Sequence, residues 1–144
     1  MDEYAYIVNV DGAVVRDDEY LLIERGADEE HAPGMLAFPG GKVETSPGET
    51  YSFEVTARRE LREEVGIEVG EVEYVLSNTF EADDGTPCLN VVTLCEYERG
   101  EAHPRASDEV AAVHWLTAEE IRERDAPEFL VEYVERLEEH RHVK

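Results

Sequence analysis

The most informative stretch of this 144-residue sequence is residues 59–67, Arg-Glu-Leu-Arg-Glu-Glu-Val-Gly-Ile. Within this stretch and just before it, apolar residues recur at every fourth position, at Phe53, Ala57, Leu61 and Val65. That spacing is typical of one face of an α-helix. The glycine that follows Val65 is typical of a residue that ends a helix. The sequence therefore predicts an amphipathic helix over residues 50–65.

Three carboxylates share one face of this predicted helix. Glu60 lies three residues before Glu63 and four before Glu64, and residues at these spacings are neighbours on a helix surface. Carboxylate oxygens are the hard ligands that Mg²⁺ and Mn²⁺ prefer, and Mg²⁺ commonly bridges carboxylates and substrate phosphates. The helix is therefore a candidate metal site. Arg59, four residues before Glu63, is expected to orient that glutamate through a charge-assisted hydrogen bond.

The rest of the chain alternates between strand patterns and a few helical ones, which predicts an α/β/α or α+β sandwich around a mixed sheet. Its length fits one domain, residues 1–144. Pro39-Gly40-Gly41 is typical of a sharp turn with two permissive glycines. The expected strands cover residues 4–15, 20–23, 35–38, 71–81, 89–98 and 110–115, with a loop at 26–34 and helices at 117–123 and 127–140.

Two local features add detail to these elements. Thr117, with Glu120 three residues later, predicts a capping box at the start of a helix. Three aromatic side chains on the predicted strands, Tyr4, Tyr6 and Phe80, are expected to pack in the core rather than line a base pocket.

The charge balance limits the classes of partner. The chain carries 36 acidic and 13 basic residues, a formal net charge of −23. Such a field repels nucleic-acid backbones and anionic membranes, so neither is expected as a partner. It also repels an anionic nucleotide unless metal cations neutralise the approach. An acidic protein with a nucleotide substrate therefore favours a divalent metal cofactor.

Cysteine usage and hydropathy favour a cytoplasmic location. Cys88 and Cys95 fall on one predicted strand, where seven residues of extended chain keep them too far apart for a disulfide. Reduced cysteines are typical of an intracellular protein. The N-terminus has no pattern of a signal peptide, and no stretch approaches the roughly 20 apolar residues of a membrane span.

Residues 38–67 resemble the signature sequence of the Nudix hydrolases. That signature runs glycine, five residues, glutamate, seven residues, and then Arg-Glu-apolar-x-Glu-Glu-x-Gly-apolar. Its second half is matched at every position from Arg59 to Ile67, and its first half begins at Gly41. Seventeen residues separate Gly41 from Arg59 where the signature has thirteen, so four residues are inserted near 45–50. With the flanking strands, the resemblance covers about residues 4–125.

The resemblance implies a Nudix-type α/β/α sandwich and a metal site on the predicted helix. Its metal ligands would be Glu60, Glu63, Glu64 and the carbonyl group of Gly40.

The insertion leaves the upstream carboxylate ligand open. Counting back from Arg59 by the signature's spacing lands on Tyr51, which has no carboxylate, so Glu49 and Glu44 are the two candidates. Substrate contacts are expected from Gly41, Lys42 and Glu44. A further carboxylate to activate water is expected at Glu109, just before a strand, with Asp83 and Asp84 as rivals.

The function that the resemblance implies is Mg²⁺-dependent pyrophosphohydrolysis of a nucleoside diphosphate linked to another group, with Mn²⁺ as the alternative ion. The short chain favours nucleoside triphosphates, cleaved to the monophosphate and pyrophosphate. The alternatives are an ADP-ribose or nucleotide-sugar pyrophosphatase, and a nucleotide-binding module without turnover. The expected partner is a small nucleotide, and the assembly is either a monomer or a homodimer.

The acidic, lysine-poor composition predicts stabilisation by salt, as in proteins of salt-loving organisms. Lys42 and Lys144 are the two lysines, and the other eleven basic residues are arginine. Because the Debye length falls to about 3 Å at 1 M salt, high salt should screen the self-repulsion. We expect the melting temperature to rise between low and molar NaCl in a thermal denaturation series. A melting temperature independent of salt would contradict this expectation.

Overall fold

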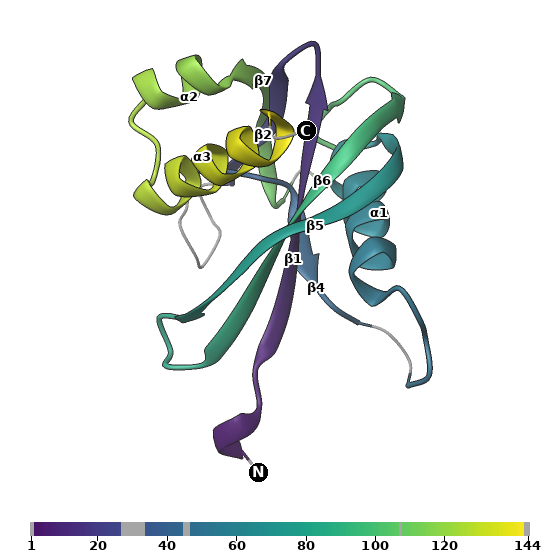
Figure 1. Cartoon of the computed structure of the whole chain (residues 1–144), viewed down its shortest axis with the longest axis vertical. Coiled ribbons are helices and arrows are strands. Elements are labelled where there is room, and N and C mark those ends of the chain that lie inside the picture. The colour runs from purple at the N-terminus through teal and green to yellow at the C-terminus, as the bar shows by residue number, and fades with distance from the viewer. Residues whose placement is uncertain (1, 27–33, 45–46, 107, 143–144) are drawn as a thin grey trace.

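The computed structural model describes residues 2–26, 34–44, 47–106 and 108–142 and contains a seven-stranded mixed sheet (Figure 1). Five strands follow the order β3-β2-β1-β6-β5, with β4 beside β1 and β7 beside β2. β1 and β6 run parallel, and the other pairs are antiparallel. The elements in chain order are η1 (Asp2–Tyr4), β1 (Ile7–Arg16), β2 (Glu19–Arg25), β3 (Leu36–Ala37), β4 (Gly40–Lys42), α1 (Ser52–Val65), β5 (Glu68–Glu81), β6 (Pro87–Arg99), β7 (Val110–Thr117), α2 (Ala118–Glu123) and α3 (Glu128–His142).

Helices cover both faces of the sheet. In Figure 1, α1 lies on one side and α2 and α3 lie on the other. The apolar stripe of α1, including Leu61 and Val65, packs into one buried cluster with Val10 of β1. A second cluster joins α2 and α3 to the opposite face of the sheet through residues such as Ile121 and Leu137. The expected α/β/α sandwich is confirmed.

The ends of the predicted helices are also confirmed. Gly66 ends α1 in a left-handed conformation with φ 72°, and its N–H donates a hydrogen bond to the carbonyl group of Arg62. The side chains of Thr117 and Glu120 form both hydrogen bonds of a capping box at α2. Within the described residues, no helix is long and apolar enough to cross a membrane.

The turn expected at Pro39-Gly40-Gly41 is wrong. Gly40 and Gly41 belong to β4, which pairs antiparallel with Asp11 and Val10 of β1, and neither glycine has a positive φ. Both glycines are instead needed because other groups approach them closely. A Cβ atom on Gly40 would lie 2.4 Å from the carbonyl oxygen of Val10. The two adjacent glycines therefore do mark a special position in the fold. The physical reason is the close approach of neighbouring atoms and not the geometry of a turn.

The expectation that the three aromatic side chains pack in the core is also wrong. Tyr4, Tyr6 and Phe80 are 74%, 49% and 47% exposed. The β5–β6 hairpin and the N-terminal end of β1 extend beyond α3 (Figure 1), so no helix covers them there. The two cysteines on β6 are free, as expected, and both are buried. Most of the expected loop at 26–34, and residues 45–46 of the insertion, lie outside the described residues.

Replacing Gly66 tests how the end of α1 is fixed. We expect Gly66→Ala to lower the free energy of unfolding by at least about 1–2 kcal/mol, the cost of a left-handed conformation for a residue with a Cβ atom. The new Cβ atom would also lie 2.5 Å from the His103 ring. Gly48→Ala is the matched control, because Gly48 has φ 94° but open space around it. Urea denaturation showing an equal or larger loss for Gly48→Ala would contradict this account.

Candidate functional site

The candidate site lies where α1 contacts β4, and Gly41 makes this contact possible. A Cβ atom on Gly41 would lie 2.4 Å from both the carboxyl carbon and Oε1 of Glu60. The carboxylate of Glu60 therefore rests against the main chain of β4, in space that any other residue at position 41 would fill. This close approach fixes one acidic side chain of α1 beside a strand.

Glu64 forms an acidic pair with Glu60 and is the more deeply buried of the two. Its side chain lies one helical turn beyond Glu60, and the residue is 5% exposed. It is hydrogen-bonded to Glu60 and accepts a hydrogen bond from the main-chain N–H of Gly40. Burial is the main cause that raises the pKa of Glu64, to about 9, and the charges of Glu60 and Glu109 raise it further. An ionised carboxylate here is destabilised by desolvation and by like charge, so a cation between the two carboxylates would be strongly favoured.

Arg59 connects the helix to β4 and to the chain that follows it. Its Nη2 atom donates hydrogen bonds to the carbonyl oxygen of Lys42 at 2.8 Å and to Oε2 of Glu60 at 3.2 Å. Oε2 of Glu44 lies 3.8 Å from the same nitrogen. The expected hydrogen bond to Glu63 is not the contact observed, because the guanidinium group turns toward β4 whereas Glu63 is exposed. Arg59 thus orients Glu60 in the structure, and its buried Nε atom has no hydrogen-bond partner within the described residues.

Glu109 approaches the pair from a loop that caps the end of α1. The main-chain N–H of Arg105 donates a hydrogen bond to the carbonyl oxygen of Glu64 at 2.8 Å, and the N–H of Gly26 donates one to the carbonyl oxygen of Glu109 at 2.9 Å. These bonds hold the loop between α1 and β2. The charge of Glu109 is consequently close enough to raise the pKa of Glu64.

The two alternatives to Glu109 as the water-activating residue lie elsewhere. Asp83 and Asp84 are in the turn of the β5–β6 hairpin, where Asp84 accepts a hydrogen bond from the N–H of Thr86. Figure 1 places that turn on the opposite side of the molecule from α1.

The two candidates for the upstream carboxylate differ in their surroundings. Glu44 follows β4 directly and forms the ion pair with Arg59. Glu49 lies just before α1, is exposed, and has no hydrogen bond or ion pair within the part of the chain that the structure describes. The structure thus brings Glu44, and not Glu49, to the residues around Glu60.

The donor set fits a hydrated divalent cation. Among residues 2–26, 34–44, 47–106 and 108–142, no three His, Cys, Asp or Glu side chains converge tightly enough to form a complete metal cage. Mg²⁺ seldom needs one, since it keeps several waters and binds through one or two carboxylates plus substrate phosphates. The paired carboxylates of Glu60 and Glu64, with the main chain of Gly40 alongside, could supply those protein ligands.

A polar cluster on the opposite face of the sheet was not predicted. Asp11 of β1 lies directly behind Gly40, so that a Cβ atom on Gly40 would be 2.6 Å from its Oδ1 atom. Burial raises the pKa of Asp11 to about 6, against the opposing effect of hydrogen bonds from Asn90 and Asn9. The signal in the sequence was the alternation Asn9-Val10-Asp11 within a strand that is otherwise apolar.

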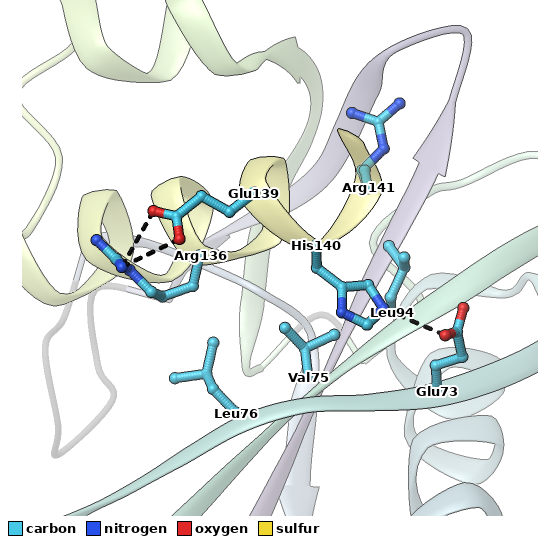
Figure 2. A pocket seen from close by; sticks show the side chains of 8 residues that line it. All are labelled: Glu73, Val75, Leu76, Leu94, Arg136, Glu139, His140 and Arg141. Carbon is cyan, nitrogen blue, oxygen red and sulfur yellow. Dashed lines mark hydrogen bonds and ion pairs between the residues drawn. The ribbon is translucent and has the colours of Figure 1, made fainter. Parts of the chain in front are cut away.

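A hollow on the surface lies away from these residues. It has a volume of about 870 Å³ and separates α3 from β5 (Figure 2). Nε2 of His140 and Oε1 of Glu73 lie 3.2 Å apart across it, above a floor of Val75, Leu76 and Leu94. None of the acidic residues of α1 lines this groove, so it is separate from the candidate site.

Comparison with known proteins identifies the family. Residues 6–137 match the NUDIX domain. The chain is 36% identical over 133 residues to a MutT-like protein of Streptomyces ambofaciens, covering 91% of this chain and 77% of that one. It is 40% identical over 73 residues to the CTP pyrophosphohydrolase of Escherichia coli K12, half of each chain.

Solved structures share the fold. A MutT protein from Methanosarcina mazei superimposes with a TM-score of 0.80 at 24% identity, over 98% of this chain and 99% of that one. The NUDIX domain of Shewanella oneidensis NrtR, solved with ADP-ribose, gives a TM-score of 0.75 at 18% identity, over 94% and 88%.

The chain belongs to the Nudix hydrolase family. It is therefore an enzyme of a family that acts on phosphoanhydride bonds in nucleoside diphosphate-linked compounds and generally uses divalent metal ions.

Metal binding at Glu64 should be visible as a change in stability. We expect Mg²⁺ or Mn²⁺ to raise the melting temperature of the protein, because a ligand that binds only the folded state stabilises it by about 2.7 kcal/mol at a hundred times its Kd. Glu64→Gln should remove this increase. Glu71→Gln, an exposed position on β5, is the matched control and should keep it. An unchanged metal response in Glu64→Gln would show that the ion binds elsewhere.

Proposed function

We propose that the protein is an Mg²⁺-dependent pyrophosphohydrolase, with nucleoside triphosphates as its substrates and a monophosphate and pyrophosphate as products. One observation carries this proposal, namely the Glu60–Glu64 carboxylate pair held against the Gly40–Gly41 strand. Two acids that share a hydrogen bond in a largely buried setting favour a divalent cation. Phosphoanhydride hydrolysis needs such a charge beside the phosphates.

One group of residues at the site is assigned to binding the metal ion. Glu60, Glu64 and the Gly40 carbonyl would hold the ion, with Glu63 available to bind a second ion from the exposed side. When bound, Mg²⁺, or Mn²⁺ in its place, would neutralise phosphate charge and make a neighbouring water a better nucleophile near neutral pH. Arg59 fixes the carboxylate of Glu60.

The remaining residues act on the substrate and the water. Lys42, the one lysine among the described residues, contacts phosphate oxygens together with the main chain of Gly41. Water attacks the α- or the β-phosphorus of the triphosphate, the P–O bond to the leaving pyrophosphate or nucleoside monophosphate breaks, and the water proton passes to Glu109. Glu44 pairs with Arg59 and orients its guanidinium group. Glu49 contributes less than Glu44 to catalysis.

The choice of triphosphates rests on two relatives. One relative, named a MutT-like protein, matches most of this chain. The other, named a CTP pyrophosphohydrolase, matches half of it. The alternative is hydrolysis of ADP-ribose or a nucleotide sugar, supported by the fold shared with a NUDIX domain solved with ADP-ribose. A binding module without turnover is less favoured, because the acids of Glu60, Glu63 and Glu64 are all present.

The charge and composition support the remaining parts of the proposal. With a net charge of −23, the protein takes a small nucleotide with its cations and not a nucleic acid. Residues 1–144 act as one catalytic domain in the cytoplasm, as a monomer or a homodimer.

A product assay tests the activity. The protein is incubated with nucleoside triphosphates, ADP-ribose and dinucleoside polyphosphates, with and without Mg²⁺, in H₂¹⁸O. We expect Mg²⁺-dependent release of a monophosphate and pyrophosphate, with one ¹⁸O atom in one of the two products. Glu60→Gln should lower kcat by at least about a hundredfold, the usual cost of losing a preorganised charge contact. No turnover of any compound would contradict the enzymatic proposal.

A matched pair of variants tests whether Glu44 or Glu49 is the carboxylate upstream of α1 that completes the site. Glu44→Gln removes one of the two carboxylates that pair with Arg59, whereas Glu49→Gln removes a carboxylate with no contact in the described part of the chain. We expect the loss of kcat to be larger for Glu44→Gln, while both variants keep the melting temperature of the parent protein. A larger loss for Glu49→Gln would show that the loop before α1 supplies the ligand in the substrate complex.

A further inference from the structure

A row of polar side chains crosses the face of the sheet opposite α1. The register aligns Lys42 of β4, Asn9 of β1, Asn90 of β6 and Asn78 of β5 as direct cross-strand neighbours. Residues directly opposite each other in a sheet share a face. Asp11, two residues after Asn9, lies on the same face. Three asparagines and a carboxylate are an unusual content for the face of a sheet that packs on a helix.

Hydrogen bonds fix this row in one arrangement. The amide nitrogen of Asn9 donates to Oδ1 of Asp11 at 3.1 Å and to Oδ1 of Asn90 at 2.7 Å. Asn90, which is 4% exposed, donates to Oδ2 of Asp11 at 3.1 Å and to the hydroxyl group of Tyr133 at 3.0 Å. Tyr133 of α3 in turn donates to Oδ1 of Asn78 at 2.8 Å. The buried half of the row is thus tied to α3.

The outer half of the row has unused capacity to accept hydrogen bonds. The amide oxygen of Asn9 has no hydrogen bond within the described residues, and both donors of its amide group are already used. The carboxylate of Asp11 has capacity to accept further hydrogen bonds. Both residues are only partly buried. Two neighbouring acceptors in a fixed orientation suit a ligand that carries amino or imino N–H groups.

The surroundings of these acceptors suit a planar ring. Ile7 lies two residues before Asn9 on the same face and is 39% exposed. Phe80, at 47% exposure, belongs to the same cross-strand row as Ile7 through Cys88. Apolar surface beside fixed hydrogen-bond acceptors is the usual composition of a site for a flat heterocycle.

The position of the row relative to β4 connects it to the catalytic side. Gly40 pairs with Asp11 and Lys42 pairs with Asn9, while the carboxylates of Glu60 and Glu64 lie on the opposite side of β4. β4 has three residues and, among the described strands, pairs with β1 alone. A nucleotide lying across this short edge strand would have one end near Asn9 and Asp11 and its phosphates near Lys42 and the α1 carboxylates.

We propose that Asn9 and Asp11 read the nucleobase of the substrate by accepting hydrogen bonds from its exocyclic amino group. Asn90 and Tyr133 are positioning residues that hold the two acceptors. The proposal rests on the proposed nucleotide hydrolysis and adds a preference to it: bases with an amino group are favoured over otherwise matched bases that lack one.

Matched nucleotides test the preference. GTP and ITP differ by one amino group, and CTP and UTP differ by an amino-for-oxo exchange. We expect the parent protein to have a KM about tenfold lower for GTP than for ITP, and for CTP than for UTP, the usual effect of one net hydrogen bond. Equal KM values within both pairs would overturn the proposal.

Variants locate the preference in the row. Asn9→Leu removes the free acceptor, and Asp11→Asn replaces a carboxylate with a group of the same shape. We expect each to reduce the amino preference to about twofold or less, through KM and not through kcat. Tyr133→Phe should weaken the preference to a smaller extent. Thr79→Ala is the control, because Thr79 lies next to Asn78 on β5 but faces away from the row. A full preference in both Asn9→Leu and Asp11→Asn would contradict the assignment.

Binding without turnover separates this proposal from the function on which it rests. GMP and IMP are titrated into the protein, and the ¹⁵N-labelled side-chain amide signals of Asn9 and Asn90 are followed by NMR. Ribose 5-phosphate serves as the ligand without a base. We expect shifts of these signals with GMP that are larger than with IMP and absent with ribose 5-phosphate. The same shifts with ribose 5-phosphate would overturn base reading, whatever the product assay shows.

Discussion

The structure of the site depends on one contact, the carboxylate of Glu60 resting against the main chain of Gly41. The absence of a side chain at position 41 lets α1 approach β4 so closely that a Cβ atom would lie 2.4 Å from the carboxylate. This approach brings Glu64, one turn further along α1, to the N–H of Gly40 and into contact with Glu60. The two carboxylates then share a space too small and too dry for two unneutralised negative charges. This packing is the basis for proposing that a cation binds between them.

The same short strand also links the two faces of the sheet. Gly41 and Val10 face α1, while Gly40, Asp11 and Lys42 belong to the side that α3 covers. In the proposed binding mode, the substrate crosses the three residues of β4, with its phosphates at the acids of α1 and its base at the polar row. In a protein with a net charge of −23, Lys42 and the metal ions would supply the attraction for phosphate on this path.

The sequence allowed the prediction of features that depend on local periodicity and local chemistry. The fourfold spacing of apolar residues predicted α1, Gly66 predicted its end, and Thr117 predicted the capping box. The order of acids after Arg59 singled out the candidate metal ligands, which the structure places at the contact with β4 except for the exposed Glu63. These features could be predicted because the residue spacing on a helix face is set by local geometry and does not depend on where the helix packs.

Features that depend on contacts distant in sequence were not predictable. The glycine pair reads as a turn, yet it forms a strand, because the need for glycine comes from Glu60 and Val10 on other elements. Arg59 turned out to contact Lys42 and Glu60, a choice set by the position of β4. The exposure of Phe80 follows from a hairpin that extends past α3 (Figure 1). The asparagine row exists only through the register of β4, β1, β6 and β5.

We propose that a divalent ion binds between Glu60, Glu64 and the Gly40 carbonyl. The most direct measurement is a crystal structure of the protein soaked with Mn²⁺, with anomalous scattering used to locate the ion. We expect an anomalous peak about 2.0–2.2 Å from oxygens of Glu60 and Glu64, with waters completing an octahedral shell. A peak only at other acidic residues, or none at saturating Mn²⁺, would contradict it.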